Sequence, residues 1–251
     1  MAVDNAFATH PGKAAEAAER INEDFAHAWV KDGVNYQIAA DGNHRTEFLN
    51  PAPFVVNEIQ RFIEAYSEPQ MSLPELKRML SGAIYSANRI LLAFKQADGE
   101  RYDHRTFATV DLTAVTEKKE FVLAHVGDGR IYLIRGGKLR QLTKDHTEAQ
   151  RLCDDGKITK EQIFQHPDRD LLTSALGFDN PKIDVRSGRV QDGDIVMLLT
   201  DGAHKVISPE QLHDIVMEAG NCFETCNGVI KVANALGGPD NISVCVSYLR
   251  K

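Results

Sequence analysis

The order of the expected elements predicts an α+β fold in which antiparallel sheets are covered by helices. Short segments with alternating or β-branched apolar residues come in blocks, and pairs of segments with helical spacing separate these blocks. A βαβ series would instead alternate single strands with single helices. The 251 residues are 43% hydrophobic, which is enough apolar surface for one large domain with its own core.

The first third of the chain is expected to form a hairpin and two helices. The polar turn Lys31-Asp32-Gly33 lies between two alternating segments, which is typical of a β-hairpin. Ser72 and Glu75 have the spacing of a capping box at a helix start. The expected elements are strands 25–30 and 34–40, followed by amphipathic helices 53–66 and about 73–94.

Turn dipeptides divide the rest of the chain. Asp128-Gly129 and Gly136-Gly137 separate short strands, and Asp201-Gly202 is predicted to be a turn at the end of a strand. The expected elements are strands 106–115, 120–126, 130–135 and 138–142, short helices 148–156 and 159–165, a strand pair 183–190 and 194–200, helices 209–219 and 222–236, and a closing strand 242–249.

Charge and hydropathy argue against several classes of partner. The net charge is -7 and no basic stripe is present, so nucleic acid is not an expected partner. No apolar run approaches the roughly 18 to 20 residues needed to cross a bilayer, and residues 1–11 lack the pattern of a signal peptide. Cys153, Cys222, Cys226 and Cys245 are interpreted as reduced thiols of a cytoplasmic protein.

Three aspartates share one placement relative to apolar strands. Asp41 and Asp201 each follow such a strand directly, and Asp240 lies between a glycine turn and the closing strand. Carboxylates that cluster repel one another unless a divalent cation neutralises them, and hard oxygen ligands suit Mg²⁺ or Mn²⁺. Asp-Gly and Asp-Asn are also ordinary turn dipeptides, so the spacing alone leaves both interpretations open.

The residues around these aspartates resemble the PPM (PP2C-type) serine/threonine protein phosphatases. Residues 124–135 are similar to the Val-Gly-Asp-Ser-Arg hairpin of that family and continue into a similar block at 137–147. The resemblance covers roughly residues 20 to 249. Further blocks follow in the family's order: Asn22-Glu23-Asp24, Ala40-Asp41-Gly42, 172–177, 199–202 and 238–244.

The resemblance implies a four-layer αββα sandwich, in which helical hairpins flank two antiparallel sheets. It implies a single domain over residues 1–251, with a variable amino-terminal segment at about 1–18. Cys153 to Pro167 is similar to the flap of bacterial members, which implies a small flap subdomain at about 146–170.

The resemblance also implies a centre that holds two Mn²⁺ or Mg²⁺ ions and admits a third. A water that bridges two cations loses a proton more readily and attacks phosphorus in line. The resemblance implies that Asp41 bridges both ions, with the Gly42 carbonyl as a further ligand, and that Asp201 and Asp240 bind the first ion. It implies that Glu23 and Asp24 act on the second ion, directly or through water. Asp128 would bind the third ion together with Asp201.

Two departures from the family pattern concern the substrate phosphate. The arginine that the family uses to grip phosphate is replaced by Glu19, and Arg20 follows one position later. Arg20 is either the phosphate ligand or an ordinary solvated charge. After Asp41-Gly42 the chain continues Asn43-His44-Arg45 in place of Met-Gly-Gly. His44 is a candidate general acid or a plain loop histidine, and Arg45 is a further candidate for holding phosphate.

These observations favour a hydrolase that acts on phosphoserine and phosphothreonine in phosphorylated proteins and opposes a serine/threonine kinase pathway. The altered loop and the displaced arginine leave an alternative, a regulatory or binding module of the same fold that has lost turnover. A metal-dependent nuclease or small-molecule phosphoesterase would explain the carboxylates but not the ordered blocks, and the acidic balance argues against the nuclease.

Overall fold

Two five-stranded antiparallel sheets form the centre of the computed structural model, which describes residues 2–43, 49–97 and 105–250. The first sheet consists, in spatial order, of β1 (Ala2–His10), β12 (Ile242–Arg250), β11 (Ile195–Leu199), β8 (Arg130–Arg135) and β9 (Lys138–Gln141). The second consists of β10 (Asp184–Arg189), β7 (Glu120–Val126), β6 (Val110–Thr116), β3 (Val34–Ala40) and β2 (Phe25–Lys31). Two short strands, β4 (Gly42–Asn43) and β5 (Phe107–Ala108), pair with each other.

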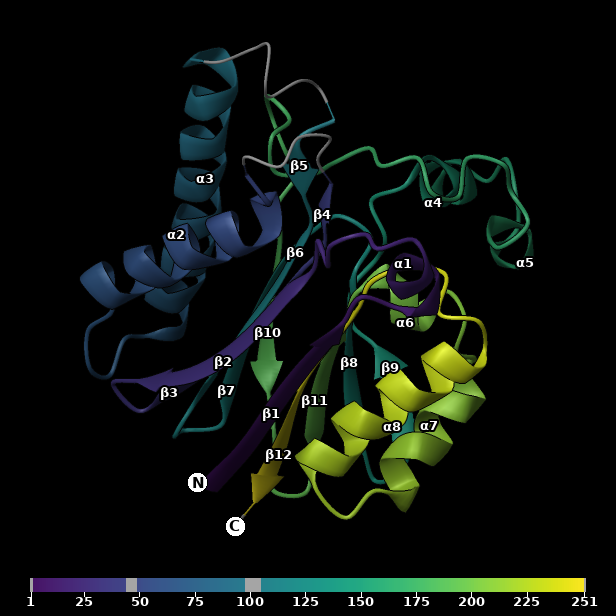
Figure 1. Cartoon of the computed structure of the whole chain (residues 1–251). Helices are drawn as coiled ribbons and strands as arrows, with labels where there is room; N and C mark the ends of the chain where they lie inside the picture. Colours follow the sequence, from purple (N-terminus) through teal and green to yellow (C-terminus); the bar gives the residue numbers. More distant parts are fainter. Residues whose placement is uncertain (1, 44–48, 98–104, 251) are drawn as a thin grey trace.

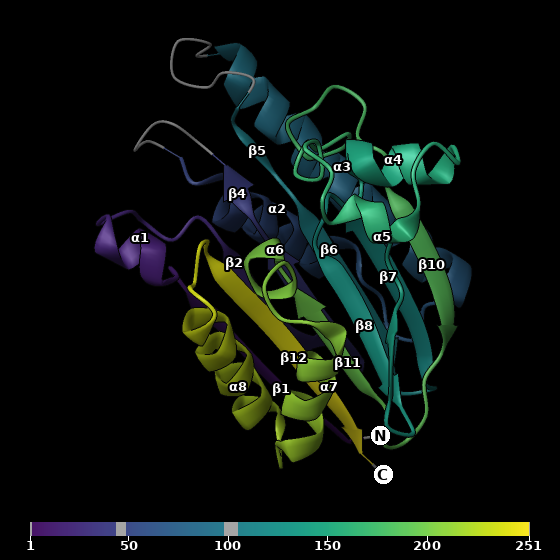
Figure 2. The same cartoon turned by 90° about the vertical axis from the view of Figure 1, so that its right-hand side faces the viewer.

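A layer of helices covers the outer face of each sheet (Figure 1). The second sheet is covered by α2 (Pro51–Tyr66) and α3 (Leu73–Ala97), and the first sheet by α7 (Pro209–Glu218) and α8 (Cys222–Ala235). In Figure 2 the view is turned so that α7 and α8 lie in front of the sheets and α2 and α3 lie behind them. The predicted α+β sandwich of two antiparallel sheets is therefore confirmed.

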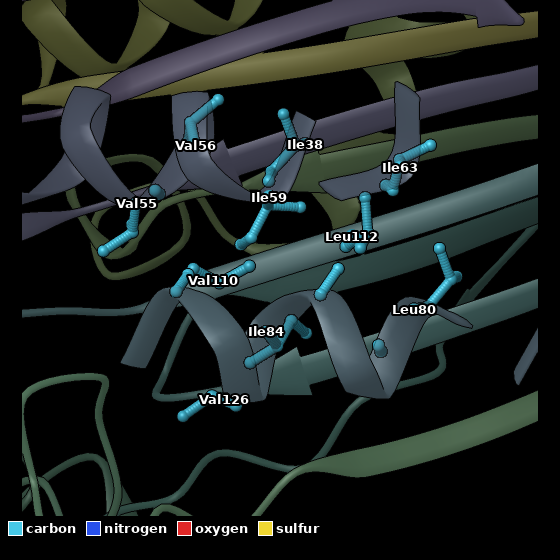
Figure 3. Close-up of a cluster of buried hydrophobic side chains, with 14 of the residues drawn as sticks. Ile38, Val55, Val56, Ile59, Ile63, Leu80, Ile84, Val110, Leu112 and Val126 are labelled. Atoms are coloured by element: carbon cyan, nitrogen blue, oxygen red, sulfur yellow. The ribbon is translucent and has the colours of Figure 1, made fainter. Parts of the chain in front are cut away.

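The alternation of side chains along the strands builds three apolar cores. In β11, Ile195 and Met197 face α7 and α8, whereas Val196 and Leu198 face the other sheet. This is the period of two that a strand imposes on its side chains. Figure 3 shows the core beneath α2 and α3, where the labelled side chains interlock: Ile38, Val55, Val56, Ile59, Ile63, Leu80, Ile84, Val110, Leu112 and Val126.

The long helices begin where their capping residues place them. The Asn50 side chain accepts a hydrogen bond from the Ala52 backbone N–H at 3.1 Å, and Pro51 occupies the first turn of α2. At the start of α3, the Glu75 carboxylate accepts from the Ser72 backbone N–H at 2.8 Å, as the predicted capping box requires.

The amino-terminal segment holds elements that the sequence patterns do not predict. Strand β1 pairs with β12 along its whole length, from Ala2 opposite Arg250 to His10 opposite Ile242, and the short helix α1 (Lys13–Ala17) follows. As an edge strand with half-exposed residues, β1 carries too little apolar alternation to be recognised.

Three expectations about local structure are wrong. The predicted strand pair 183–190 and 194–200 is not a hairpin, because β10 pairs with β7 in the second sheet and β11 lies between β12 and β8 in the first. The predicted strand 106–115 is divided into β5 and β6. Asp201-Gly202 is not a turn but the first residues of a short helix, α6 (Asp201–His204).

Two short helices, α4 (Glu148–Asp154) and α5 (Lys160–Ile163), lie within the predicted flap. In Figure 1 they stand to the right of the sheets, apart from both helix layers. None of the helices in the described part of the chain is long and apolar enough to cross a membrane.

Candidate metal centre

The aspartates predicted to bind metal lie at one end of the two sheets. Asp41 directly follows β3 and Asp24 directly precedes β2, its antiparallel neighbour. In the first sheet, Asp201 follows β11 and Asp240 comes just before β12, which are also antiparallel neighbours. Antiparallel pairing puts the end of one strand beside the start of the next, so each pair of aspartates reaches the same edge. Figure 2 shows β4 and α6 at this end of the sheets.

Two glycines let the loops at this end approach each other. A Cβ atom at Gly202 would lie 1.9 Å from the carbonyl oxygen of Asn241, so no side chain fits between α6 and the loop before β12. A Cβ atom at Gly42 would lie 2.8 Å from the carbonyl oxygen of Glu23. The glycine of Asp201-Gly202 therefore serves a close approach of two chain segments, which brings Asp201 towards Asp240.

Three of the carboxylates are close enough to share a cation. Asp41, Asp128 and Asp201 each place an oxygen within 4.8 Å of the others. They line a cleft of about 420 Å³, and the predicted ligands Glu23, Gly42 and Asp240 line it as well. Carboxylates at such separations are stabilised by a divalent cation, and oxygen ligands of this kind suit Mn²⁺ or Mg²⁺.

Asp24 shows the need for a cation most directly. The side chain is buried, its Oδ2 accepts a hydrogen bond from the Thr200 hydroxyl at 2.6 Å, and its Oδ1 has no hydrogen-bond partner. Burial raises the pKa of Asp24 to about 7, against the effect of the Thr200 hydrogen bond, and the charge of Asp201 adds to the rise. A buried carboxylate oxygen without a partner is costly, so a bound cation fits this position.

Burial and neighbouring negative charges also raise the pKa values of the cleft carboxylates Asp41 and Asp240. Burial raises the pKa of Asp41 well above its ordinary value, and the neighbouring carboxylates raise it further. Burial and the charge of Asp201 also raise the pKa of Asp240, although its Oδ1 accepts a hydrogen bond from the Asn241 backbone N–H at 2.9 Å. A divalent ion favours the ionised form of every carboxylate around it, so the donor set fits Mn²⁺ or Mg²⁺.

A positive side chain reaches into this cluster from Lys205, at the end of α6. Its Nζ lies 2.6 Å from Asp201 Oδ2, 2.7 Å from Asp170 Oδ1 and 3.3 Å from Asp128 Oδ2. Burial opposes the charge of Lys205, but Asp201 and Asp128 together raise its pKa, so the ammonium keeps its protons. Burial and Asp201 nevertheless raise the pKa of Asp128 to about 7, with Lys205 acting in the opposite direction.

Of the residues predicted to handle phosphate, Arg20 is the one that the structure describes. Arg20 is exposed between α1 and β2 and does not line the cleft, although its charge opposes the rise in the pKa of Asp240. His44 and Arg45 lie outside the described residues. A different guanidinium, that of Arg169, lines the cleft and donates to the Phe164 carbonyl at 2.9 Å.

Sequence reasoning missed Lys205, Asp170 and Arg169. The first of these had a signal, because Lys205 is four residues after Asp201 and residues at that spacing share one face of a helix. The interpretation of Asp201-Gly202 as a turn hides that spacing. Asp170 and Arg169 belong to an irregular segment after α5, where no periodic pattern indicates which side chains turn towards the cleft.

Comparisons with known proteins agree with this geometry. The sequence profile of the family described as protein phosphatase 2C matches residues 11–237. The serine/threonine phosphatase stp of Listeria welshimeri is 30% identical over 222 residues, which cover 85% of this chain and 84% of that protein.

Solved structures extend the similarity to the fold. The serine/threonine phosphatase of S. agalactiae is 25% identical with a TM-score of 0.88, covering 99% of this chain and 100% of that one. The catalytic domain of the serine/threonine protein phosphatase PstP, solved in complex with 2 manganese ions, is 26% identical with a TM-score of 0.79 and covers 99% of each chain. Nothing in these comparisons supports the alternative of a module without turnover.

Proposed function

Because this chain belongs to the protein phosphatase 2C family of metal-dependent serine/threonine protein phosphatases, we propose that the acidic cleft at the end of its two sheets is the active site. The family's members act on phosphorylated proteins, and this enzyme is a hydrolase of the same kind that uses Mn²⁺ or Mg²⁺. The observation that carries the proposal is the buried Asp24 beside the partly exposed Asp41: the pKa of both is raised, and Asp24 Oδ1 has no hydrogen-bond partner, so a cation fits between them.

The proposed ligands are distributed over both sheets. Asp41 and the Gly42 carbonyl come from the end of β3, Asp201 and Asp240 come from the first sheet, and Glu23 and Asp24 act on the second ion directly or through water. Two divalent ions, when bound, supply the acidity that makes a water nucleophilic near neutral pH and the positive charge that offsets the phosphoryl oxygens.

Neighbouring polar groups hold several of these carboxylates in place. The Thr200 hydroxyl fixes Asp24 at 2.6 Å, and the Asn241 backbone N–H fixes Asp240 at 2.9 Å. The Asn241 side chain also accepts from the Glu23 backbone N–H at 2.8 Å and donates to the Pro11 carbonyl at 2.8 Å. We expect such contacts to orient the ligands before an ion arrives, which lowers the cost of binding it.

Arg20 and His44 are proposed to handle the substrate. A guanidinium binds phosphate oxygens in pairs, and the charge of Arg20 already acts on Asp240 in the cleft. His44 follows the metal ligand Gly42 by two residues and is proposed as the acid that protonates the leaving oxygen, with Arg45 as an alternative phosphate ligand. Phosphopeptide turnover by Arg20→Ala and His44→Ala tests the two roles separately, since only the variant that removes a substrate contact should lose rate.

The remaining proposals concern the domain and its setting. We propose that residues 1–251 form one phosphatase domain with a variable segment at about 1–18, and that residues 146–170, including α4 and α5, form its flap. The four free cysteines support a reducing, cytoplasmic location. The proposed substrates are the products of a cognate serine/threonine kinase pathway.

The test is the release of phosphate from a phosphothreonine peptide with and without Mn²⁺. The wild type should release phosphate only with the ion, and Asp240→Asn should lose most of that activity. Asp214→Asn is a matched control, because it removes the same charge from an exposed position on α7. Turnover that is absent with Mn²⁺, or unchanged in Asp240→Asn, contradicts the proposal.

A further inference from the structure

Lys205 lies where three carboxylates from separate parts of the chain converge. Asp128 comes from the turn between β7 and β8, Asp201 from the start of α6, and Asp170 from the segment that follows α5. We call these three the outer carboxylates. The Lys205 side chain is 29% exposed, whereas those of Asp128 and Asp201 are 5% and 12% exposed.

The geometry of the ammonium suits this position. Lysine has three N–H donors and no acceptor, and its Nζ has three carboxylate oxygens at 2.6, 2.7 and 3.3 Å. Asp201 uses Oδ2 for this contact, and an ionised carboxylate has a second oxygen that can accept from or bind another cation. The pair Asp128 and Asp201 is the one that the family resemblance assigns to a third ion, and the ammonium already lies between them.

We propose that the Lys205 ammonium is a built-in cation that takes the place of a third metal ion at the outer carboxylates and ties Asp170 of the flap to the metal centre. The inference rests on the proposed function for the two remaining ions. Asp128 is then a partner of Lys205 and not a metal ligand.

This arrangement has two chemical consequences. A side-chain ammonium is covalently attached to the chain and cannot leave as an ion does, so it offsets part of the charge of the outer carboxylates at any metal concentration. It carries one positive charge instead of two and has no open position for water, so it can hold the carboxylates and the flap but cannot supply a metal-activated water.

The test counts bound Mn²⁺ on the intact protein by equilibrium dialysis, with free Mn²⁺ read by electron paramagnetic resonance. The wild type and Asp128→Asn should both bind two ions, because Asp128 serves Lys205. Lys205→Asn should bind a third ion, and the double variant Lys205→Asn/Asp128→Asn should return to two. Lys205→Arg, which keeps the charge, and Lys138→Asn, an exposed lysine on β9, should both bind two.

Two results would overturn the inference. One is a wild type that binds three ions and loses one in Asp128→Asn, a comparison that does not depend on the folding of any Lys205 variant. The other is a folded Lys205→Asn that still binds two. A wild type that binds no Mn²⁺ would contradict the proposed function itself, so the two failures are distinguishable.

Discussion

Two groups of carboxylates meet at the end of the sheets, and their charges are offset in different ways. The inner carboxylates are the buried Asp24 and the partly exposed Asp41. Desolvation and the neighbouring carboxylates raise the pKa of Asp41, and Asp24 Oδ1 has no hydrogen-bond partner. The outer carboxylates surround the ammonium of Lys205. Asp170 illustrates the difference, since burial would raise its pKa but Lys205 lowers it.

A further carboxylate, Asp145, extends the comparison away from the cleft. Arg130 donates to it from Nε at 3.0 Å and from Nη2 at 2.8 Å. Burial alone would raise the pKa of Asp145, yet the hydrogen bonds and charge of Arg130 lower it. The chain thus supplies its own cation beside Asp145 and beside the outer carboxylates, of which Asp201 is also a proposed metal ligand, whereas the proposed partner of the inner carboxylates is an exchangeable ion.

The largest expected effect follows from removing an inner charge. Asp41→Asn should reduce Mn²⁺-dependent phosphopeptide turnover by roughly 10³-fold, because the ions that offset phosphoryl charge lose their shared ligand. The fold should persist, because the substitution removes one of several neighbouring negative charges that repel one another. Steady-state kinetics with Asp214→Asn as the control measures this, and a loss smaller than about threefold would place the ions elsewhere.

Removing the arginine of the buried ion pair between Arg130 and Asp145 should lower the stability of the fold. Arg130→Met leaves Asp145 buried without its partner, and removal of one member of a buried pair costs about 3 to 5 kcal/mol. Urea unfolding measures the loss. The double variant Arg130→Met/Asp145→Leu, which removes both charges, should recover much of it, and a single variant of wild-type stability would show that Asp145 needs no cation.

The metal-free protein should become less stable as the pH rises. The folded-state pKa of Asp24 is about 7 against 3.8 for the ordinary group, so the folded form holds a proton that the unfolded form has released. Stability is therefore lost progressively as the pH rises from about 4 and the loss is complete above about 7. Between pH 5 and pH 8 we expect a loss of roughly 2 to 3 kcal/mol, or about 4 to 12 °C in Tm.

The matched control for this pH dependence is Asp24→Asn, which has nearly the same side-chain volume and no proton to release. In the presence of a chelator, the Tm of this variant should change less with pH than the Tm of the wild type. Saturating Mn²⁺ should also flatten the wild-type profile, since the ion holds Asp24 ionised at both pH values. Parallel profiles for the two metal-free proteins would contradict the assignment.

The smallest effect is expected at a surface pair. Lys119 Nζ lies 2.8 Å from Asp192 Oδ2, and the two side chains are 37% and 28% exposed. Solvent screens such pairs, so Lys119→Ala should cost no more than about 1 kcal/mol in urea unfolding. A loss as large as that of Arg130→Met would mean that burial does not decide which carboxylates need a cation.

Much of this arrangement is visible in the sequence, for a physical reason. Strands such as β3 and β11 are buried on both faces because each lies between a helix layer and the other sheet, and an aspartate at the end of such a mostly apolar strand stands out. The family resemblance then ordered those aspartates into one centre. Both the sandwich and the cleft carboxylates other than Asp170 could therefore be predicted.

The parts that escaped prediction depend on three-dimensional contacts. Strand β1 is fixed by its pairing with β12, which lies at the other end of the chain. The sequence does not show that β10 and β11, which follow each other along the chain, belong to different sheets. Lys205 was not predicted because Asp201-Gly202 has the sequence of a turn. A glycine is required at position 202 because the Asn241 backbone lies too close to α6 for a side chain.

The most direct measurement is anomalous X-ray scattering at the manganese absorption edge from crystals grown with Mn²⁺. The account predicts two peaks among Asp41, Asp201, Asp240 and the Glu23–Asp24 segment, and none between Asp128 and Lys205. A peak between Asp128 and Asp201 with Lys205 displaced would contradict the built-in cation. The absence of any peak near Asp41 would contradict the metal centre.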